Sequence, residues 1–227
     1  MELLYFARGP ALAISIAVFF IGTLWRLIGI LRLPRLADHA APRPGAPTPT
    51  RAAANAVVRG LWPRREFGQA AAVITFNGYV FHVGLALIFF GYAPHIEFVR
   101  RLVGFGWPAL PDVVMYLASG LTMLSLLFAL WWRLTQAERR LISSADDYIS
   151  WTLAFLPIAT GMAVLGTPSD AILTRDHVIY HGTLAIHLLS LELLLLWFPF
   201  GKLMHAVLFV FSRRATGLRF ARRGVGV

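Results

Sequence analysis

The chain has 227 residues, of which 58% are hydrophobic and 14% are charged, and its mean hydropathy is +0.67. A soluble domain of this size cannot bury that much apolar surface, so the composition predicts an integral membrane protein. The net charge of +10 comes from basic clusters between apolar spans, and this membrane-topology pattern argues against nucleic-acid binding. The chain has no cysteine, which excludes Cys-ligated iron–sulfur clusters, thiolate-ligated haem, covalent Cys-x-x-Cys-His haem attachment and disulfides.

Five apolar stretches have the length of roughly 17 to 25 residues that a helix needs to cross a bilayer. They run from about Pro10 to Leu31, Ala71 to Tyr92, Val113 to Leu134, Tyr148 to Leu165 and Gly182 to Phe211. The predicted fold class is therefore an all-α integral membrane protein, a five-helix transmembrane bundle formed by a single domain, residues 1–227. Pro94 should stop the second helix, while Pro157 and Pro199 should kink the fourth and fifth.

Residues 33–69, between the first and second spans, have a different composition. Several prolines among Ala, Thr and Arg predict an extended basic linker without a core of its own. We expect this linker either to lie along a soluble partner or to remain disordered beside anionic lipid. A second basic segment, the tail 213–227, follows the fifth span.

Arginines gather in the linker, after the third span and in the tail, and the opposite side of the bundle holds only Arg8, Arg100, Arg101 and Arg175. The positive-inside rule then places the N-terminus outside and the C-terminus in the cytoplasm. This arrangement fits five crossings of the cell inner membrane.

The segment from His187 to His205 is the most informative part of the chain. Eighteen residues make five turns of a continuous helix, so both imidazoles would leave one face about 27 Å apart. His82 lies in the antiparallel second span at a depth close to that of His205, so these two rings should face each other, while His187 lies near the outer surface. Ionisable groups inside a membrane usually serve a function. We therefore predict a b-type cytochrome whose iron is held between histidines of neighbouring helices.

Two stretches resemble a known family. Phe81-His82-Val83-Gly84 and the segment from His187 through Phe198-Pro199-Phe200-Gly201-Lys202-Leu203-Met204-His205 are similar to the gamma subunit of respiratory nitrate reductase. Its relatives include the membrane cytochromes associated with dissimilatory sulfite reductase and heterodisulfide-reductase-like complexes, and the long basic linker resembles the sulfite-reductase-associated branch. The resemblance covers the whole five-helix frame.

The resemblance implies a haem b-containing subunit of a respiratory complex, which transfers electrons between a membrane quinone or quinol and a cytoplasmic iron–sulfur partner subunit. It implies that His82 and His205 hold an inner haem and that His187 ligates an outer haem. Such a chain would be one subunit of an oxidoreductase and not a complete enzyme. By analogy, the quinone pocket lies beside the outer haem, among the second and fifth helices and the loop around His95.

The fourth ligand departs from the family pattern. The family places it ten residues after the first ligand, where this chain has Tyr92, and His95 is three residues further on. On a continuous helix His95 would point about 140° away from the face of His82. Since Pro94 ends the helix, His95 belongs to a turn that can fold back over the outer haem. Three alternatives stay open: His95, Tyr92 as in catalase, or a missing or differently ligated outer site. We predict two haems, with one haem as the alternative.

Other polar residues have two interpretations each. Lys202 either reaches a haem propionate near the cytoplasmic surface or anchors the helix at the interface. Glu192 either belongs to a proton path or is a neutral acid bonded to a neighbouring helix. His177 and His181 are surface residues, spare ligands or acceptors of quinol protons, and His39 is solvated in the linker.

Two other functions compete with the cytochrome. One is a transporter or channel in which His82, Glu192 and His205 form a proton or metal path, although the sequence shows no internal repeat. The other is a haem-free membrane anchor for a soluble redox complex.

Overall fold

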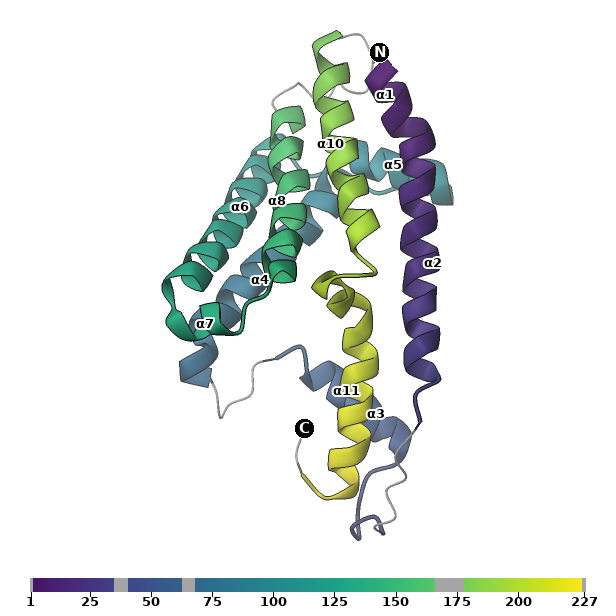
Figure 1. Cartoon of the computed structure of the whole chain (residues 1–227), viewed down its shortest axis with the longest axis vertical. Helices are drawn as coiled ribbons and strands as arrows, with labels where there is room; N and C mark the ends of the chain where they lie inside the picture. Colours follow the sequence, from purple (N-terminus) through teal and green to yellow (C-terminus); the bar gives the residue numbers. More distant parts are fainter. Residues whose placement is uncertain (1, 35–40, 63–67, 166–177, 226–227) are drawn as a thin grey trace.

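The computed structural model describes residues 2–34, 41–62, 68–165 and 178–225, with the side chains of 68–70 and 178–181 excluded. All regular elements in these ranges are helices, which confirms the all-α prediction (Figure 1). In chain order they are α1 (Glu2–Phe6), η1 (Ala7–Ala11), α2 (Leu12–Leu31), α3 (Pro49–Arg59), α4 (Gly68–Gly91), α5 (Ala93–Val103), α6 (Asp112–Thr135), α7 (Ala137–Leu141), α8 (Ala145–Leu165), α10 (Val178–Trp197), η3 (Lys202–Met204) and α11 (His205–Arg222).

Among the described residues, four helices are long and apolar enough to cross a membrane, and a bent pair makes a fifth span if its two halves are counted as one. The four are Glu2–Leu31, Ala71–Gly91, Asp112–Thr135 and Ala145–Leu165, and the bent pair is Gly182–Trp197 with Lys202–Arg222. Large apolar side chains point outward from these helices, as in Phe20, Phe76 and Leu121. A soluble monomer rarely exposes so much apolar surface, so the chain has the character of a multi-pass membrane protein.

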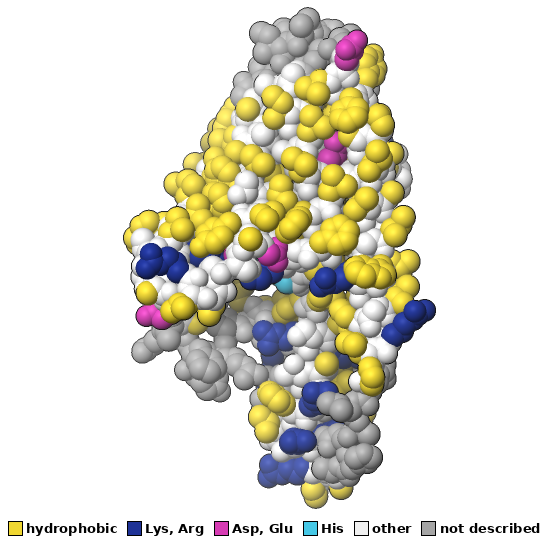
Figure 2. Space-filling view, viewed as in Figure 1, with side chains coloured by type: hydrophobic (Ala, Val, Ile, Leu, Met, Phe, Trp, Pro, Cys, Tyr) yellow, Lys and Arg dark blue, Asp and Glu magenta, His cyan; other side chains and the backbone are white. Residues whose placement is uncertain are grey.

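The surface divides by side-chain type. Figure 2 shows hydrophobic side chains over most of the described upper part of the visible face, and Lys and Arg in its lower half, over α7 and α11. This separation is what a bilayer around the upper part of the bundle requires, because charged side chains are costly inside hydrocarbon.

The first span begins earlier than predicted. α1, η1 and α2 follow one another as a single rod from Glu2 to Leu31 rather than from Pro10 (Figure 1). Pro10 lies inside η1, which is a π-helical turn. A proline has no N–H to give to the helix, and the wider turn accommodates it without ending the rod.

α4 and α6 pack closely because small and polar residues meet between them. A Cβ on Gly84 would overlap the hydroxyl oxygen of Thr122, so only glycine permits this approach. Two turns away, Asn77 donates from Nδ2 to the carbonyl of Ser125 at 3.2 Å, and the hydroxyl of Ser125 donates back to the carbonyl of Asn77 at 3.1 Å. These contacts fix the position of α4, which carries His82.

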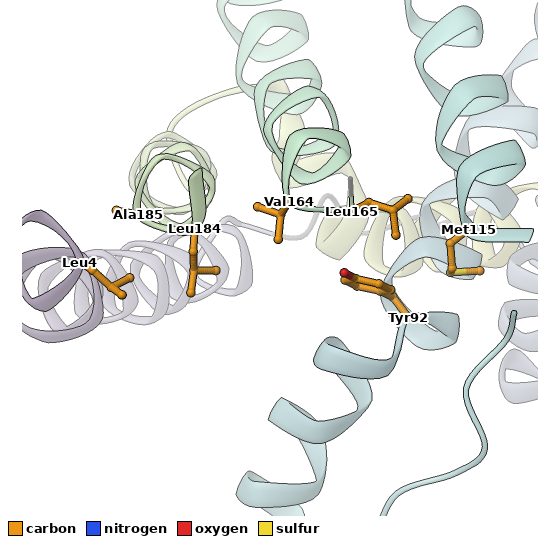
Figure 3. Packing of buried hydrophobic residues seen from close by; sticks show 7 residues of the cluster. All are labelled: Leu4, Tyr92, Met115, Val164, Leu165, Leu184 and Ala185. Atoms are coloured by element: carbon orange, nitrogen blue, oxygen red, sulfur yellow. The ribbon is translucent and has the colours of Figure 1, made fainter. Parts of the chain in front are cut away.

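A buried apolar cluster joins the helices at the end of the bundle that holds the N-terminus. It consists of Leu4, Tyr92, Met115, Val164, Leu165, Leu184 and Ala185 (Figure 3). These residues come from α1, α6, α8, α10 and the junction between α4 and α5. The cluster therefore ties that junction to α8 and α10.

The predicted extended linker is wrong in its middle part. Residues 49–59 form α3, which packs against the second half of α11 (Figure 1). Ala52 and Ala56 are buried there, and a Cβ on Gly217 would come 2.8 Å from the carbonyl oxygen of Ala52. Small residues on both helices allow the close contact that composition alone did not indicate. The tail is likewise helical, since α11 continues to Arg222.

The fifth span is broken at Pro199, where only a kink was predicted. α10 ends at Trp197, residues 198–201 form a turn, and the two halves are bent by 80°. Pro199 lies in that turn and is buried against α2, where its ring is 2.7 Å from the position of a Cβ on Gly22. Pro157, in contrast, lies within the single helix α8.

Candidate functional site

The structure brings His82 and His205 together. His82 lies on α4 and His205 is the first residue of α11, and their ring centres are 6.2 Å apart with planes at 88°. The Nδ1 of His82 is 2.7 Å from the carbonyl oxygen of Gly78, and the Nδ1 of His205 is 2.9 Å from that of Lys202. A carbonyl only accepts, so both Nδ1 atoms carry the proton, and both Nε2 atoms keep a lone pair. We call these residues the inner pair.

A second pair has the same construction. His95 lies in the first turn of α5 and His187 on α10, with ring centres 6.3 Å apart and planes at 20°. The Nδ1 of His95 is 3.1 Å from the carbonyl oxygen of Ile88. The Nδ1 of His187 is 3.2 Å from the hydroxyl oxygen of Thr160, which gives its own proton to Leu156. These residues are the outer pair.

The spacing within each pair fits one metal ion between two imidazoles. A metal–imidazole bond is about 2.0 Å long and the nitrogen lies about 1.1 Å from the ring centre, so two rings on opposite sides of one metal have centres about 6.2 Å apart. The hydrogen bonds at Nδ1 fix each ring and leave Nε2 for the metal, as is usual for metal-binding histidines. In the described part of the chain no group of three or more His, Asp or Glu has metal-binding spacing, so the candidate ligands occur as pairs.

His82 and His205 lie on separate helices as predicted, whereas the predicted geometry along the fifth span is wrong. His187 and His205 do not share one face of a straight helix, because the turn at 198–201 separates α10 from α11. Likewise α4 ends at Gly91, and Pro94 stands in the first turn of a new helix, α5. Each break turns a histidine toward its partner.

Tyr92 occupies the junction between α4 and α5. It is 7% exposed and belongs to the buried cluster (Figure 3). Its ring meets that of His95 edge-on, with centres 5.3 Å apart. The ring facing His187 is therefore that of His95, while Tyr92 packs beside it.

Two acidic residues that the sequence reading missed hold the turn before α11. Asp146 accepts hydrogen bonds from the backbone N–H of Lys202 at 3.0 Å, the indole of Trp197 at 3.2 Å and the hydroxyl of Ser150 at 2.8 Å. Asp147 accepts one from the Nζ of Lys202 and lies 3.2 Å from the guanidinium of Arg133. Two adjacent carboxylates at the start of an apolar helix were the available signal, because such charges near a membrane need partners.

An open cavity of about 250 Å³ adjoins the inner pair. His205 and Phe81 line it together with three cationic side chains, Arg133, Arg139 and Lys202. Lys202 is thus at the cavity edge, but its Nζ is engaged by Asp147. Asp147 also lines the cavity and pairs with Arg133 and Lys202, so three cations and one carboxylate give this edge a net positive charge, which suits a carboxylate-bearing ligand.

A second open cavity, of about 440 Å³, lies between α5 and residues 106–109, and neither His95 nor His187 lines it. Ile96, the residue after His95, lines it with Glu97, Arg100, Trp107 and Pro108 among others. Glu97 accepts hydrogen bonds from Arg100 at 2.7 Å and Arg101 at 2.8 Å, and these bonds lower its pKa to about 2. This cavity therefore has an anionic carboxylate at its rim, and most of its exposed lining is apolar.

The remaining predicted residues are placed as follows. Glu192 on α10 is 3% exposed, and neither carboxyl oxygen has a hydrogen-bond partner among the described residues. His39 and His177 lie outside the described residues, as does the side chain of His181.

The chain is similar to a known protein over almost its whole length. No family model matches the chain. A protein of Nitratidesulfovibrio vulgaris (strain Hildenborough) is 30% identical over 223 residues, which cover 96% of this chain and 94% of that protein. At this identity and coverage, the chain belongs to the same family as the Nitratidesulfovibrio vulgaris protein.

Proposed function

We propose that the chain is a membrane cytochrome b subunit with two b-type haems, one between His82 and His205 and one between His95 and His187. In this proposal it passes electrons between a membrane quinone and a soluble iron–sulfur partner of a respiratory complex. The proposal joins the histidine pairs of the fold with the resemblance of two motifs to the nitrate reductase gamma subunit family.

The observation that carries the proposal is the duplicate pairing of imidazoles at ring distances of 6.2 and 6.3 Å. Each ring has its Nδ1 engaged and its Nε2 left for a metal. A proton path requires a chain of closely spaced groups, whereas two separate pairs provide two axial ligand sets. The pairs thus favour a cytochrome over a transporter.

The residues of the chain have separate tasks in this proposal. A bound haem supplies the one-electron chemistry, and its potential depends on axial ligands, burial and hydrogen bonds. The carbonyls of Gly78, Lys202 and Ile88 and the hydroxyl of Thr160 hold the imidazoles as neutral Nδ1–H tautomers. Arg133 and Arg139 supply positive charge beside the inner pair, where propionate carboxylates would lie.

The two ends of the bundle then serve different partners. The open cavity between α5 and residues 106–109 suits a quinone ring, since most of its exposed lining is apolar, and α5 also carries His95. The inner pair lies toward the arginine-rich α3 and α11, which by the positive-inside rule face the cytoplasm of the inner membrane and the soluble partner.

An absorption spectrum of the purified chain tests the proposal. Dithionite reduction should produce the α band of b-type haem, and a pyridine haemochrome assay should give two haems per chain. A purified, folded chain without any haem would refute the proposal. One haem per chain would show that one of the two sites is empty, and loss of that haem in His82→Ala or in His187→Ala would show which pair holds it.

A further inference from the structure

We propose that Glu192 is a proton-binding site inside the membrane, which binds one proton when the neighbouring iron centres accept an electron and releases it when they are oxidised. This inference depends on the proposed haem function. Glu192 belongs to neither histidine pair.

Glu192 lies on the face of α10 that packs against the N-terminal rod. Ala185, Glu192 and Pro199 follow one another at intervals of seven residues, which is two helical turns, and all three are buried. Leu4 shares a buried cluster with Ala185, and Pro199 lies against Gly22. These two contacts fix the register of α2 along α10.

Between those contacts, Ser15 is the buried residue of α2. Ser15 is 0% exposed, and its hydroxyl donates to the carbonyl of Leu12 at 2.9 Å. The proton of this hydroxyl is therefore not directed at Glu192. An ionised carboxylate in such a seam of small residues lacks the donors that would replace water, so its charge is strongly coupled to other charges nearby.

No charged group on the helices packed against α10 lies at the level of Glu192. Arg8 of η1 is the nearest, roughly 7–8 Å away along the axis, and Glu2 of α1, Arg26 of α2, and Asp146 and Asp147 of α8 are more than about 10 Å away. On α10 itself, the titratable His187 is five residues away, about 8 Å along the axis and on a different face.

The position of Glu192 relative to the two histidine pairs suggests that its protonation is coupled to their oxidation state. Glu192 lies between His187 and His205 in the sequence and on the stretch of α10 that joins the outer pair to the break. Charges within roughly 10 Å of each other in a low-dielectric interior still interact strongly enough for one to change the proton or electron affinity of the other. Reduction removes one positive charge from an iron centre, and Glu192 restores the balance by binding one proton from water. A quinol, which gives up electrons together with protons, is the fitting reductant.

Infrared difference spectroscopy of the haem-loaded protein tests this inference. The reduced-minus-oxidised spectrum should contain the carbonyl stretch of a protonated carboxylic acid, shifted in D₂O. The band should vanish in Glu192→Gln and reappear at an altered frequency in Glu192→Asp, which retains the acid. The midpoint potential should fall with rising pH in the unaltered protein and less steeply in Glu192→Gln.

The haem spectrum of the same samples separates the two proposals. Normal haem content with a carboxylic band unchanged in Glu192→Gln, or with no band at all, would overturn the inference and leave the cytochrome intact. Absence of haem from the unaltered protein would overturn the proposed function and the redox linkage together.

Discussion

The carboxylate of Asp147 accepts a hydrogen bond from the Nζ of Lys202, 55 residues further along the chain. This contact joins the first turn of α8 to the short helix η3, immediately before His205. The side chain of Asp147 is only 8% exposed, and Arg133 on α6 is its second partner. Asp147 therefore connects three elements at the place where the inner pair is assembled.

Replacement of Asp147 by asparagine should loosen the turn and lower the occupancy of the inner haem while the outer haem is retained. The substitution leaves Arg133 partly buried without its carboxylate, so we expect the free energy of unfolding to fall by about 1–2 kcal/mol. This is less than for a fully buried ion pair, because Lys202 is half exposed. Haem content and thermal unfolding measure both effects. Glu138→Gln, an exposed site outside the network, is the control; equal losses in both variants would contradict the prediction.

In the proposed cytochrome, replacement of a single histidine should remove one haem and leave the other in place. His82→Ala and His205→Ala should each abolish the inner haem, whereas His95→Ala and His187→Ala should each abolish the outer one, because each iron needs both axial nitrogens. The haemochrome assay should fall from two haems to one in every variant. A Tyr92→Phe variant that retains both haems is expected as well; loss of the outer haem there would show that the phenol is the ligand.

The ring planes predict different paramagnetic signals for the two oxidised sites. Planes at 88° in the inner pair leave two iron d orbitals nearly equal in energy, whereas planes at 20° in the outer pair split them. Low-temperature EPR should therefore show a highly anisotropic low-spin signal and an ordinary rhombic one. The anisotropic signal should disappear in His205→Ala. Two signals of the same type would contradict the geometry.

Acid should affect α5 at an unusually low pH. The hydrogen bonds from Arg100 and Arg101 lower the pKa of Glu97 from 4.5 to about 2. Because the folded value is the lower one, the stabilisation from Glu97 is complete above pH 4.5 and is lost as the pH falls toward 2. Fluorescence of Trp107, which lines the same cavity, should change across that range. The Glu97→Gln variant lacks this titrating carboxyl group. A fluorescence change that persists in the variant would show that Glu97 does not cause it.

A larger side chain at Gly217 should separate α3 from α11. Gly217→Leu places atoms where Ala52 and Ala56 already lie, and overpacking of this kind typically costs about 1–3 kcal/mol. Limited proteolysis within residues 41–62 should become faster, while haem content stays unchanged. Gly29, where a Cβ meets nothing within 4 Å, gives the matched control, Gly29→Leu. Equal proteolysis rates in the two variants would argue against the packing described.

The sequence alone predicted the parts of the fold that depend on hydropathy. Runs of apolar residues identified the spanning helices, and the proximity of His82 and His205 followed from helix direction and depth. The sequence predicted only a kink at residues 198–201. The full break is stabilised by Asp146, Asp147 and the contact of Pro199 with Gly22, and Asp146, Asp147 and Gly22 are distant from the turn in the chain. α3 was not predicted for a similar reason: its apolar side consists of alanines, and only their packing against Gly217 of α11 stabilises the helix.

His205 is the first residue of α11, and the second half of that helix carries Arg214, Arg219 and Arg222 and packs against α3. Because the helix is rigid, a tilt of its arginine-bearing end also turns the imidazole at its other end. If the chain is the cytochrome subunit proposed above, docking of a soluble protein on that end would change the inner imidazole pair without reaching into the lipid, and electron exchange would then depend on whether the partner is bound.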